Sequence, residues 1–185
     1  MVGERTIASG YKEASIYTTK GIEYGVGGGV CQVSSTLYNA VLKANLDIIE
    51  RKSHRYSVPY VPLGYDATVS YGSIDFKFKN SRKYPIKLQA FAKNGIVSIS
   101  VIGMNENIEY DISFSSEQVY TIPFETKYIY DKSLSSGSQV IAQKGATGYK
   151  IDNYKIVKLD NSIISKTLIS SDTYSPLTQI VRIGK

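Results

Sequence analysis

The sequence predicts an α+β fold, in which one N-terminal helix packs on an antiparallel sheet and a small, elongated all-β module follows. A helical pattern of apolar residues occurs at 31–44, and short strand patterns come after it. Beyond Gly103 the chain is rich in Tyr, Ser and Lys, with strand patterns separated by turns and no helical stretch. We therefore expect two domains, 1–104 and 105–185.

The first domain is expected to begin with an irregular lead-in that contains one short strand at 14–19. The helix at 31–44 is predicted by apolar residues at helical spacing on one face, namely Val33, Leu37, Val41 and Ala44. Asn45 follows, where a residue in the left-handed conformation would end the helix.

Short apolar or alternating runs predict the remaining strands of the first domain at 46–51, 66–71, 74–79, 85–92 and 96–102. Two prolines exclude a central strand between residues 56 and 64, so this segment is expected to be an extended loop. Similar runs predict the strands of the second domain at 108–114, 118–130, 149–159, 163–171 and 178–183. The pairs Asn94-Gly95 and Asp160-Asn161 predict hairpin turns.

Residues 25–54 hold the only Cys and the only His of the chain. Cys31 falls at the start of the predicted helix, where unpaired N–H groups and the helix dipole favour a thiolate. Gly28 and Gly29 just before it lack side chains, so a substrate could approach the sulfur closely. A glycine loop, a Cys at a helix start and a later His indicate a thiol nucleophile with its base. The alternative is an inert, buried Cys.

His54 can reach Cys31 if a helix and a returning strand connect them. The neighbouring cations Arg51, Lys52 and Arg55 would disfavour the protonated ring, which suits a neutral general base. A third group should hold the ring, and the candidates are two carboxylates, Asp66 and Asp75. We favour Asp66 because it begins its expected strand next to a loop. The alternative for either is an exposed or turn-capping carboxylate.

Further groups are expected to bind the substrate. The backbone N–H of Cys31 or Gln32 is a candidate oxyanion donor. We expect the hydroxyls of Ser34 and Ser35 to satisfy free N–H groups of the first helical turn. Tyr71 is expected to line a substrate groove, together with Tyr56, Tyr60 and Tyr65. A phosphate loop is excluded because no Gly-Lys-Ser/Thr follows the glycines.

Composition limits the other partners. The formal net charge of +6 comes from Lys scattered along the chain, which favours a solvated surface over nucleic-acid binding. One Cys and one His can form neither an internal disulfide nor a structural zinc site, so we expect no metal and no cofactor. The chain opens without an apolar signal region, yet motif-like sequence begins almost at once. We therefore expect the chain to be a fragment of a longer protein, in which any membrane anchor would lie in segments missing from this sequence.

The stretch GGGVCQVSSTLYNAVLKANLDIIERKSH, continued by VPYVPLGYDATVSYGSIDFKFKN, closely resembles the VanW family. The resemblance covers residues 2–102, including the lead-in VGERTIASGYKEA. Asn45 stands where the family usually has Gly, and Asn tolerates the left-handed conformation. The tail, from IPFETKYIYDKSLSSGSQVIAQKGATGYK to IVRIGK, resembles a β module named for five glycines. The matching glycines are Gly137, Gly145, Gly148 and Gly184; Asp160-Asn161 replaces the usual Asn-Gly.

The VanW resemblance implies an exported protein on the extracellular face of a bacterial cell envelope, often anchored to the membrane. It implies action on peptidoglycan stem peptides, since members of the family are understood to include L,D-transpeptidases that form 3→3 cross-links through a Cys acyl-enzyme. It assigns Cys31 as nucleophile, His54 as base and Asp66 as the group that orients the base. The β module implies adhesion to wall glycans or spacing. The alternatives are a peptidoglycan hydrolase that uses the same Cys and a non-catalytic wall-binding protein.

Overall fold

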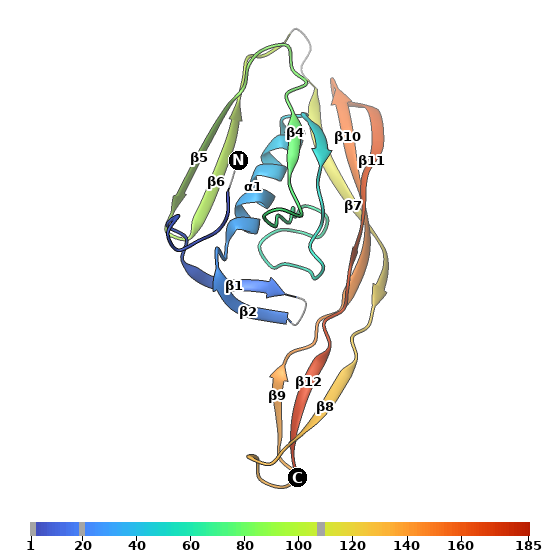
Figure 1. Cartoon of the computed structure of the whole chain (residues 1–185). Helices are drawn as coiled ribbons and strands as arrows, with labels where there is room; N and C mark the ends of the chain where they lie inside the picture. The colour runs from blue at the N-terminus through green and yellow to red at the C-terminus, as the bar shows by residue number, and fades with distance from the viewer. Residues whose placement is uncertain (1–2, 19–20, 107–109) are drawn as a thin grey trace.

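One helix, α1 (Val30–Lys43), lies at the centre of the N-terminal half of this computed structural model (Figure 1). The structure describes residues 3–18, 21–106 and 110–185. The buried residues of α1 are Ser35, Tyr38, Val41 and Leu42. The predicted apolar face is therefore only partly right: Val41 is buried, but Val33 is 41% exposed. The helix ends as predicted, with Asn45 in the left-handed conformation at a φ of 54°.

Three two-stranded antiparallel sheets accompany α1. They are formed by β1 (Glu13–Thr18) with β2 (Gly21–Val26), by β3 (Asp47–Glu50) with β4 (Lys77–Lys79), and by β5 (Lys87–Lys93) with β6 (Ile96–Ile102). α1 contacts both β3 and β6. Asn94 and Gly95 both have positive φ, so the predicted hairpin turn between β5 and β6 is confirmed. One helix with antiparallel strands confirms the α+β class.

The segment predicted as a strand at 66–71 is not one. Its backbone bonds to other elements instead: Ala67 N–H donates to Ser35 Oγ on α1 at 2.9 Å, and Thr68 N–H donates to the Lys52 carbonyl at 2.8 Å. The strand expected at 74–79 is shortened to β4. The sequence pattern also did not indicate β2 or β9 (Gln139–Gln143), and glycines at both ends of β2 weaken its strand signal.

A few predicted positions lie outside the described residues. They are residues 1 and 2 of the lead-in, residue 19 of the strand expected at 14–19, and residues 108 and 109 of the strand expected at 108–114.

The C-terminal half consists of two three-stranded sheets. In the first, β10 (Gly148–Leu159) lies between β7 (Asp111–Ile122) and β11 (Ser162–Tyr174), and all neighbours are antiparallel. In the second, β12 (Gln179–Gly184) pairs in parallel with β8 (Thr126–Asp131) and antiparallel with β9. Asp160 and Asn161 have φ of 49° and 64°, which confirms their hairpin turn. The strand expected at 118–130 is split because Pro123, which lacks an N–H, follows β7.

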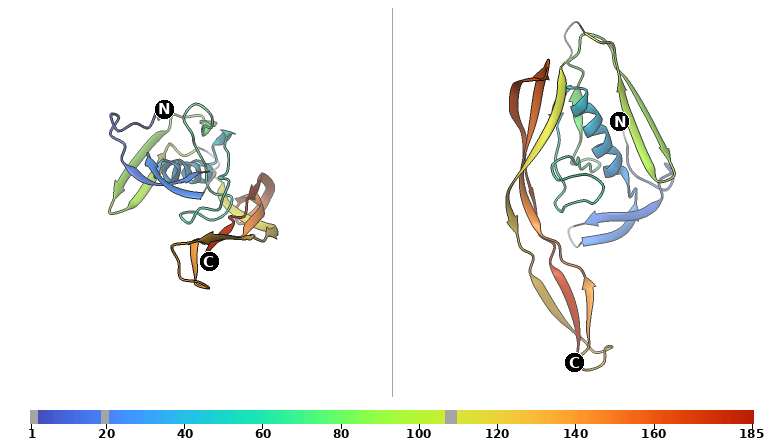
Figure 2. Two further views of the ribbon diagram at one scale, coloured as in Figure 1. Left: turned by 60° about the horizontal axis from the view of Figure 1, so that its bottom comes forward. Right: turned by 180° about the vertical axis from the view of Figure 1, so that it is seen from behind.

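The first of these sheets runs alongside the half that contains α1, whereas β8, β9 and β12 extend beyond it toward the C-terminus (Figures 1 and 2). Phe114 of β7 and Ile169 of β11 pack against the buried cluster of Tyr38, Leu42 and Ala67. The two halves therefore share part of one hydrophobic core.

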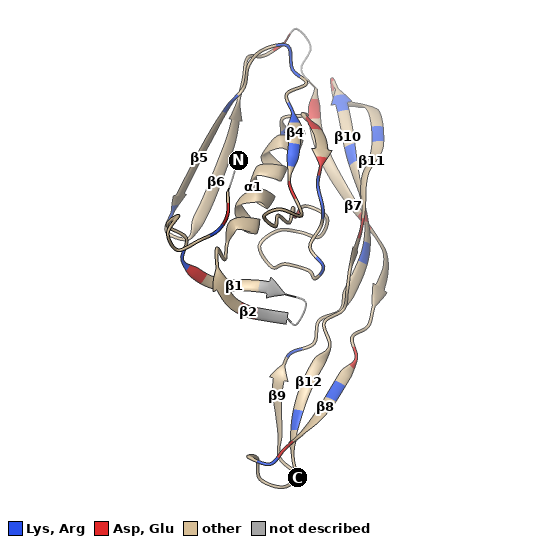
Figure 3. Cartoon of the chain, in the orientation of Figure 1, with Lys and Arg blue, Asp and Glu red and all other residues tan. Residues whose placement is uncertain are grey.

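Charged residues are distributed over both halves of the chain (Figure 3). Among the strands, Lys and Arg occur on β4, β5, β8, β10, β11 and β12, and Asp and Glu also lie on strands of both halves, as expected of a solvated surface. Among the described residues, no helix has the length and apolar character that a membrane span requires.

Candidate active site

Cys31 lies in the first turn of α1, after Gly29 with a φ of 93°. No heavy atom outside its chain neighbours lies within 4 Å of a Cβ built on Gly29, so this position is open. A Cβ on Gly28 would lie 2.5 Å from Ala14 Cβ and 2.9 Å from the Ser15 carbonyl oxygen. The structure therefore gives Gly28 a packing role against β1, in place of the expected role in clearing space for a substrate.

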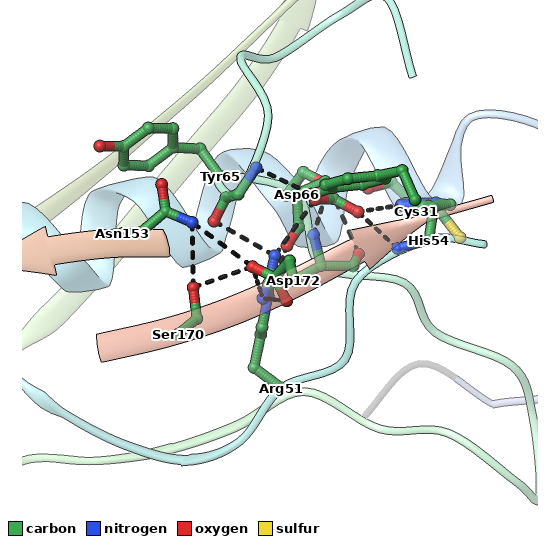
Figure 4. A network of polar contacts seen from close by, with 12 residues as sticks. Cys31, Arg51, His54, Tyr65, Asp66, Asn153, Ser170 and Asp172 are labelled. Carbon is green, nitrogen blue, oxygen red and sulfur yellow. Dashed lines mark hydrogen bonds and ion pairs between the residues drawn. The ribbon is translucent and has the colours of Figure 1, made fainter. Parts of the chain in front are cut away.

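The side chains of Cys31, His54 and Asp66 come together beside the start of α1 (Figure 4). His54 follows β3 and is only 7% exposed. Its Nδ1 lies 2.6 Å from Asp66 Oδ2, and its backbone N–H donates to the same oxygen at 2.6 Å. With Nδ1 committed to Asp66, Nε2 is left for the hydrogen bond to the Cys31 thiol. The arrangement has the order of nucleophile, base and orienting carboxylate found in cysteine enzymes.

The pKa values of the two reacting groups are shifted in opposite directions. Burial raises the pKa of the Cys31 thiol, but hydrogen bonds with His54, the Val69 backbone and Thr68 outweigh it and lower this pKa from 9.0 to about 7. Burial lowers the pKa of His54, but hydrogen bonds to Asp66 and Cys31 raise it from 6.5 to about 9. Between these values the pair is a thiolate and an imidazolium.

The expectation of a neutral imidazole is therefore wrong. Arg51, one of the cations thought to disfavour protonation, donates to Asp66 and Asp172 instead. Lys52 and Arg55 are exposed to solvent. The carboxylate of Asp66 dominates at His54, and it favours the charged ring.

Asp66 is 1% exposed, and both of its oxygens are fully used. Oδ2 accepts the two bonds from His54, and Oδ1 accepts from Arg51 Nη2 at 3.1 Å and from the Tyr174 hydroxyl. Burial raises the pKa of Asp66, but hydrogen bonds from His54 and Tyr174 and the charge of Arg51 lower it below its ordinary value. The carboxylate is thus ionised and fixed in orientation.

A set of hydrogen bonds fastens the loop of Asp66 to α1. Ser34 Oγ donates to the Ala67 carbonyl at 2.6 Å, and Ser35 Oγ accepts the Ala67 N–H. Asn39 Nδ2 donates to the Tyr65 carbonyl at 2.7 Å. The two serines therefore bind a distant loop, and the expectation that they satisfy N–H groups of the first helical turn is wrong.

The structure separates the two candidate oxyanion donors. The N–H of Gln32 already donates to the Gly29 carbonyl at 3.0 Å, so it is occupied. The N–H of Cys31 donates to no other described residue, which leaves it free to face a developing negative charge. Around the sulfur, Thr68 Oγ1 lies at 3.7 Å and the Val69 carbonyl oxygen at 3.5 Å. Sequence reasoning missed both, because a strand was expected there.

Two predicted residues lie apart from this cluster. Asp75 is exposed, and its Oδ1 accepts its neighbour's N–H, that of Phe76. Tyr71 is 64% exposed on a turn. Among the other tyrosines considered for a groove, Tyr60 is the one in contact with the base, with its hydroxyl 3.3 Å from His54 Nε2.

Two more residues of the network come from the C-terminal half, where the sequence indicated no chemistry. Tyr174 and Asp172 of β11 bond to Asp66 and to Arg51, respectively. No local motif marks them, because more than a hundred residues separate each from its partner. Among the described residues, no group of three or more His, Cys, Asp or Glu side chains is arranged to hold a metal ion.

Comparison with known proteins agrees with the two-part organisation of the chain. Residues 1–102 match the family described as VanW like protein, and residues 115–185 match the G5 domain. The uncharacterized protein YoaR of Bacillus subtilis (strain 168) is 52% identical over 101 residues, which are 55% of this chain and 33% of the relative. The match thus spans about a third of that relative's length.

Two solved structures resemble the C-terminal part. An IgA1 protease G5 domain is 21% identical with a TM-score of 0.29, covering 44% of this chain and 98% of its own. The HP0197-G5 structure is 24% identical with a TM-score of 0.24, covering 41% and 99%. These scores are low, so the G5 assignment rests on the family match. Since the VanW match covers more than half of its residues, the chain belongs to the VanW-like protein family and carries a G5 domain after the family's domain.

Proposed function

We propose that this chain is a peptidoglycan L,D-transpeptidase that forms 3→3 cross-links through a thioester on Cys31. The observation that carries the proposal is the hydrogen-bonded series of Cys31, His54 and Asp66, in which a thiolate and an imidazolium coexist near pH 7–9. A thiolate attacks acyl carbons without a further base, and an adjacent imidazolium can protonate the leaving amine.

In the first half-reaction, Cys31 Sγ attacks the carbonyl carbon of the third residue of a donor stem tetrapeptide. The negative charge that develops on the carbonyl oxygen faces the free N–H of Cys31. As the carbon–nitrogen bond breaks, His54 gives its proton to the nitrogen of the terminal D-Ala. D-Ala leaves, and a thioester and a neutral imidazole remain.

In the second half-reaction, the side-chain amine of a diamino acid in another stem attacks the thioester. His54 takes a proton from that amine, the carbon–sulfur bond breaks and the thiolate returns. Throughout, Asp66 holds the ring through Nδ1 and keeps Nε2 directed at the sulfur. Attack by water in place of the amine would give hydrolysis, which is the alternative outcome for the same site.

The domain content supports a location on the extracellular face of the cell envelope. The VanW and G5 domains together favour a cell-wall-associated protein, and the G5 domain favours contact with wall glycans. The relative YoaR is uncharacterized, so it does not indicate which reaction this chain catalyses. The donor and acceptor stems are therefore proposed from the chemistry of the site and the resemblance of the first domain.

Intact-mass spectrometry of the full chain with disaccharide-tetrapeptide muropeptides tests the proposal. We expect a mass increase equal to the acyl donor less D-Ala, free D-Ala in solution and 3→3 linked dimers. The Cys31→Ala variant should show neither adduct nor dimer. Tripeptide without dimer would indicate hydrolysis. Dimers made at an unchanged rate by Cys31→Ala, or no adduct and no product with the wild-type chain, would refute the proposal.

A further inference from the structure

The end of β11 reaches into the network behind the candidate active site, although it belongs to the C-terminal half. Tyr174 is 1% exposed, and its hydroxyl bonds to two residues of the N-terminal half. The hydroxyl oxygen accepts the N–H of Gly64 at 2.7 Å, and the hydroxyl proton is donated to Asp66 Oδ1. Burial and the negative charge of Asp66 raise the pKa of Tyr174, so this hydroxyl remains a donor.

A second side chain of β11 acts on Arg51, the other donor to the same oxygen of Asp66. Arg51 Nη1 lies 2.6 Å from each carboxylate oxygen of Asp172. Nε donates to the Asp66 carbonyl at 2.7 Å, while Nη2 donates to Asp66 Oδ1 and to the Gly64 carbonyl. The guanidinium is thereby fixed in one plane between the carboxylates of the two halves.

We propose that Tyr174 and Asp172 are positioning residues of the active site, so that the site is complete only when the C-terminal half is docked against the N-terminal half. Neither side chain would touch the substrate. They act through Asp66, whose Oδ1 receives one bond from Tyr174 directly and one from Arg51, which Asp172 orients. The reaction itself rests on the function proposed above, whereas the effect on Cys31 does not require it.

Contacts next to His54 and next to Asp66 support this role. Ser175 N–H, next to Tyr174, donates to the Arg55 carbonyl at 2.7 Å, one residue after His54. Gly64, two residues before Asp66, is packed so closely on Asn153 of β10 that a side chain there would collide with the Asn153 amide. The C-terminal half thus contacts the chain next to the base and next to the carboxylate.

Loss of the Tyr174 hydroxyl should therefore affect the Cys31 thiol indirectly, first through Asp66 and then through His54. Oδ1 of Asp66 would keep only the 3.1 Å bond from Arg51, so the carboxylate could turn toward Arg51 and loosen its bonds to His54. A less well-held imidazolium stabilises the thiolate less, and the pKa of the Cys31 thiol would rise. A change confined to general stability would not move this pKa.

The test compares full-length Tyr174→Phe with Tyr149→Phe as the matched control. Tyr149 is paired with Tyr174 across β10 and β11, and its hydroxyl makes no bond to Asp66. Asp172→Asn serves as a second variant and tests the positioning role if Tyr174→Phe does not fold. For each folded chain we would measure circular dichroism and the rate of Cys31 alkylation by iodoacetamide across pH.

We expect the midpoint of alkylation to rise from about 7 toward 9.0 in Tyr174→Phe and Asp172→Asn, and alkylation at pH 7 to slow several-fold. Tyr149→Phe should follow the wild-type curve. If the folded variants keep the wild-type midpoint while the wild-type chain forms its acyl adduct, the positioning role is refuted and the proposed function stands. If the midpoints shift but no adduct forms, the transpeptidase function is refuted and the positioning role stands.

Discussion

At Cys31, hydrogen bonding outweighs burial. The sulfur is partly buried, which alone would keep its proton in place, yet the hydrogen bond to His54 lowers the pKa of the thiol to about 7. His54 in turn keeps its proton because Asp66 is ionised and only 2.6 Å from Nδ1. Each group depends on the next one, so the loss of a single hydrogen bond in the series should change the pKa of the Cys31 thiol.

The acylation rate should therefore be bell-shaped in pH. Below about 7 the thiol holds its proton and the nucleophile is lost; above about 9 the imidazolium loses the proton that the leaving amine needs. The two limbs belong to the coupled pair. Single-turnover thioester formation, followed by mass spectrometry between pH 5 and 10, checks this. A rate that still rises above the pKa of His54 would contradict it.

Substituting each carboxylate in turn distinguishes Asp66 from Asp75 as the group that orients His54. Asp66→Asn should slow acylation by at least about 100-fold, because the imidazolium loses its buried counter-charge and its orientation. The alkaline limb should also move to lower pH, since His54 would lose its proton more readily. Asp75→Asn, at an exposed carboxylate of the same type, is the control and should match the wild-type rate. Equal rates for all three chains would remove Asp66 from the mechanism.

At the scale of elements, the site depends on an irregular loop held between a helix and a sheet. Residues 64–67 are fastened to α1 by Ser34, Ser35 and Asn39, and Gly64 approaches Asn153 of β10 on the other side. Gly64 has a φ of 86°, which disfavours any side chain there as well. The position of Asp66 is thus set by both neighbours at once.

Gly64→Ala should therefore destabilise the protein more than the same change at another glycine with positive φ. Gly72, with a φ of 76° and no atom within 4 Å of a Cβ, is the matched control. Gly72→Ala should cost about 1–2 kcal/mol in free energy of unfolding through backbone strain. Gly64→Ala should cost about 1–3 kcal/mol more because the methyl group must displace Asn153. Urea unfolding monitored by circular dichroism measures both, and equal losses would show that the two halves do not pack closely there.

At the scale of the whole molecule, the two family domains are joined through one polar network and part of one core. Phe114 and Ile169 extend the core cluster around Tyr38, and the ion pair of Arg51 Nη1 with both carboxylate oxygens of Asp172 crosses the same boundary. Separating the halves would leave the buried charge of Arg51 without Asp172, which costs free energy of folding. The two halves should therefore depend on each other for stability. The candidate active site lies against this boundary.

Local sequence patterns predicted the features that depend on residues close together in the chain. The helix α1, the turns at Asn94-Gly95 and Asp160-Asn161, and the proximity of Cys31 to His54 were all predictable from the sequence. The charge of His54 was not, because it is set by Asp66 and Cys31, which only the folded chain brings to the ring. The contact of Tyr174 with Asp66 was not predictable either, since it joins residues 108 positions apart. Pairings at that distance leave no trace in hydrophobic period or turn chemistry.

The most direct test of the central claim is a titration of the Cys31 thiolate in the intact chain, followed by its ultraviolet absorbance. Cys31 is the only Cys, and subtracting the titration of Cys31→Ala removes the absorbance of ionised tyrosines, so the remaining signal comes from this thiolate. We predict half-ionisation near pH 7 in the wild-type chain and a return toward 9.0 in His54→Ala. An ordinary wild-type midpoint near 9.0, unchanged by the loss of His54, would contradict the thiolate–imidazolium pair and the catalytic mechanism built on it.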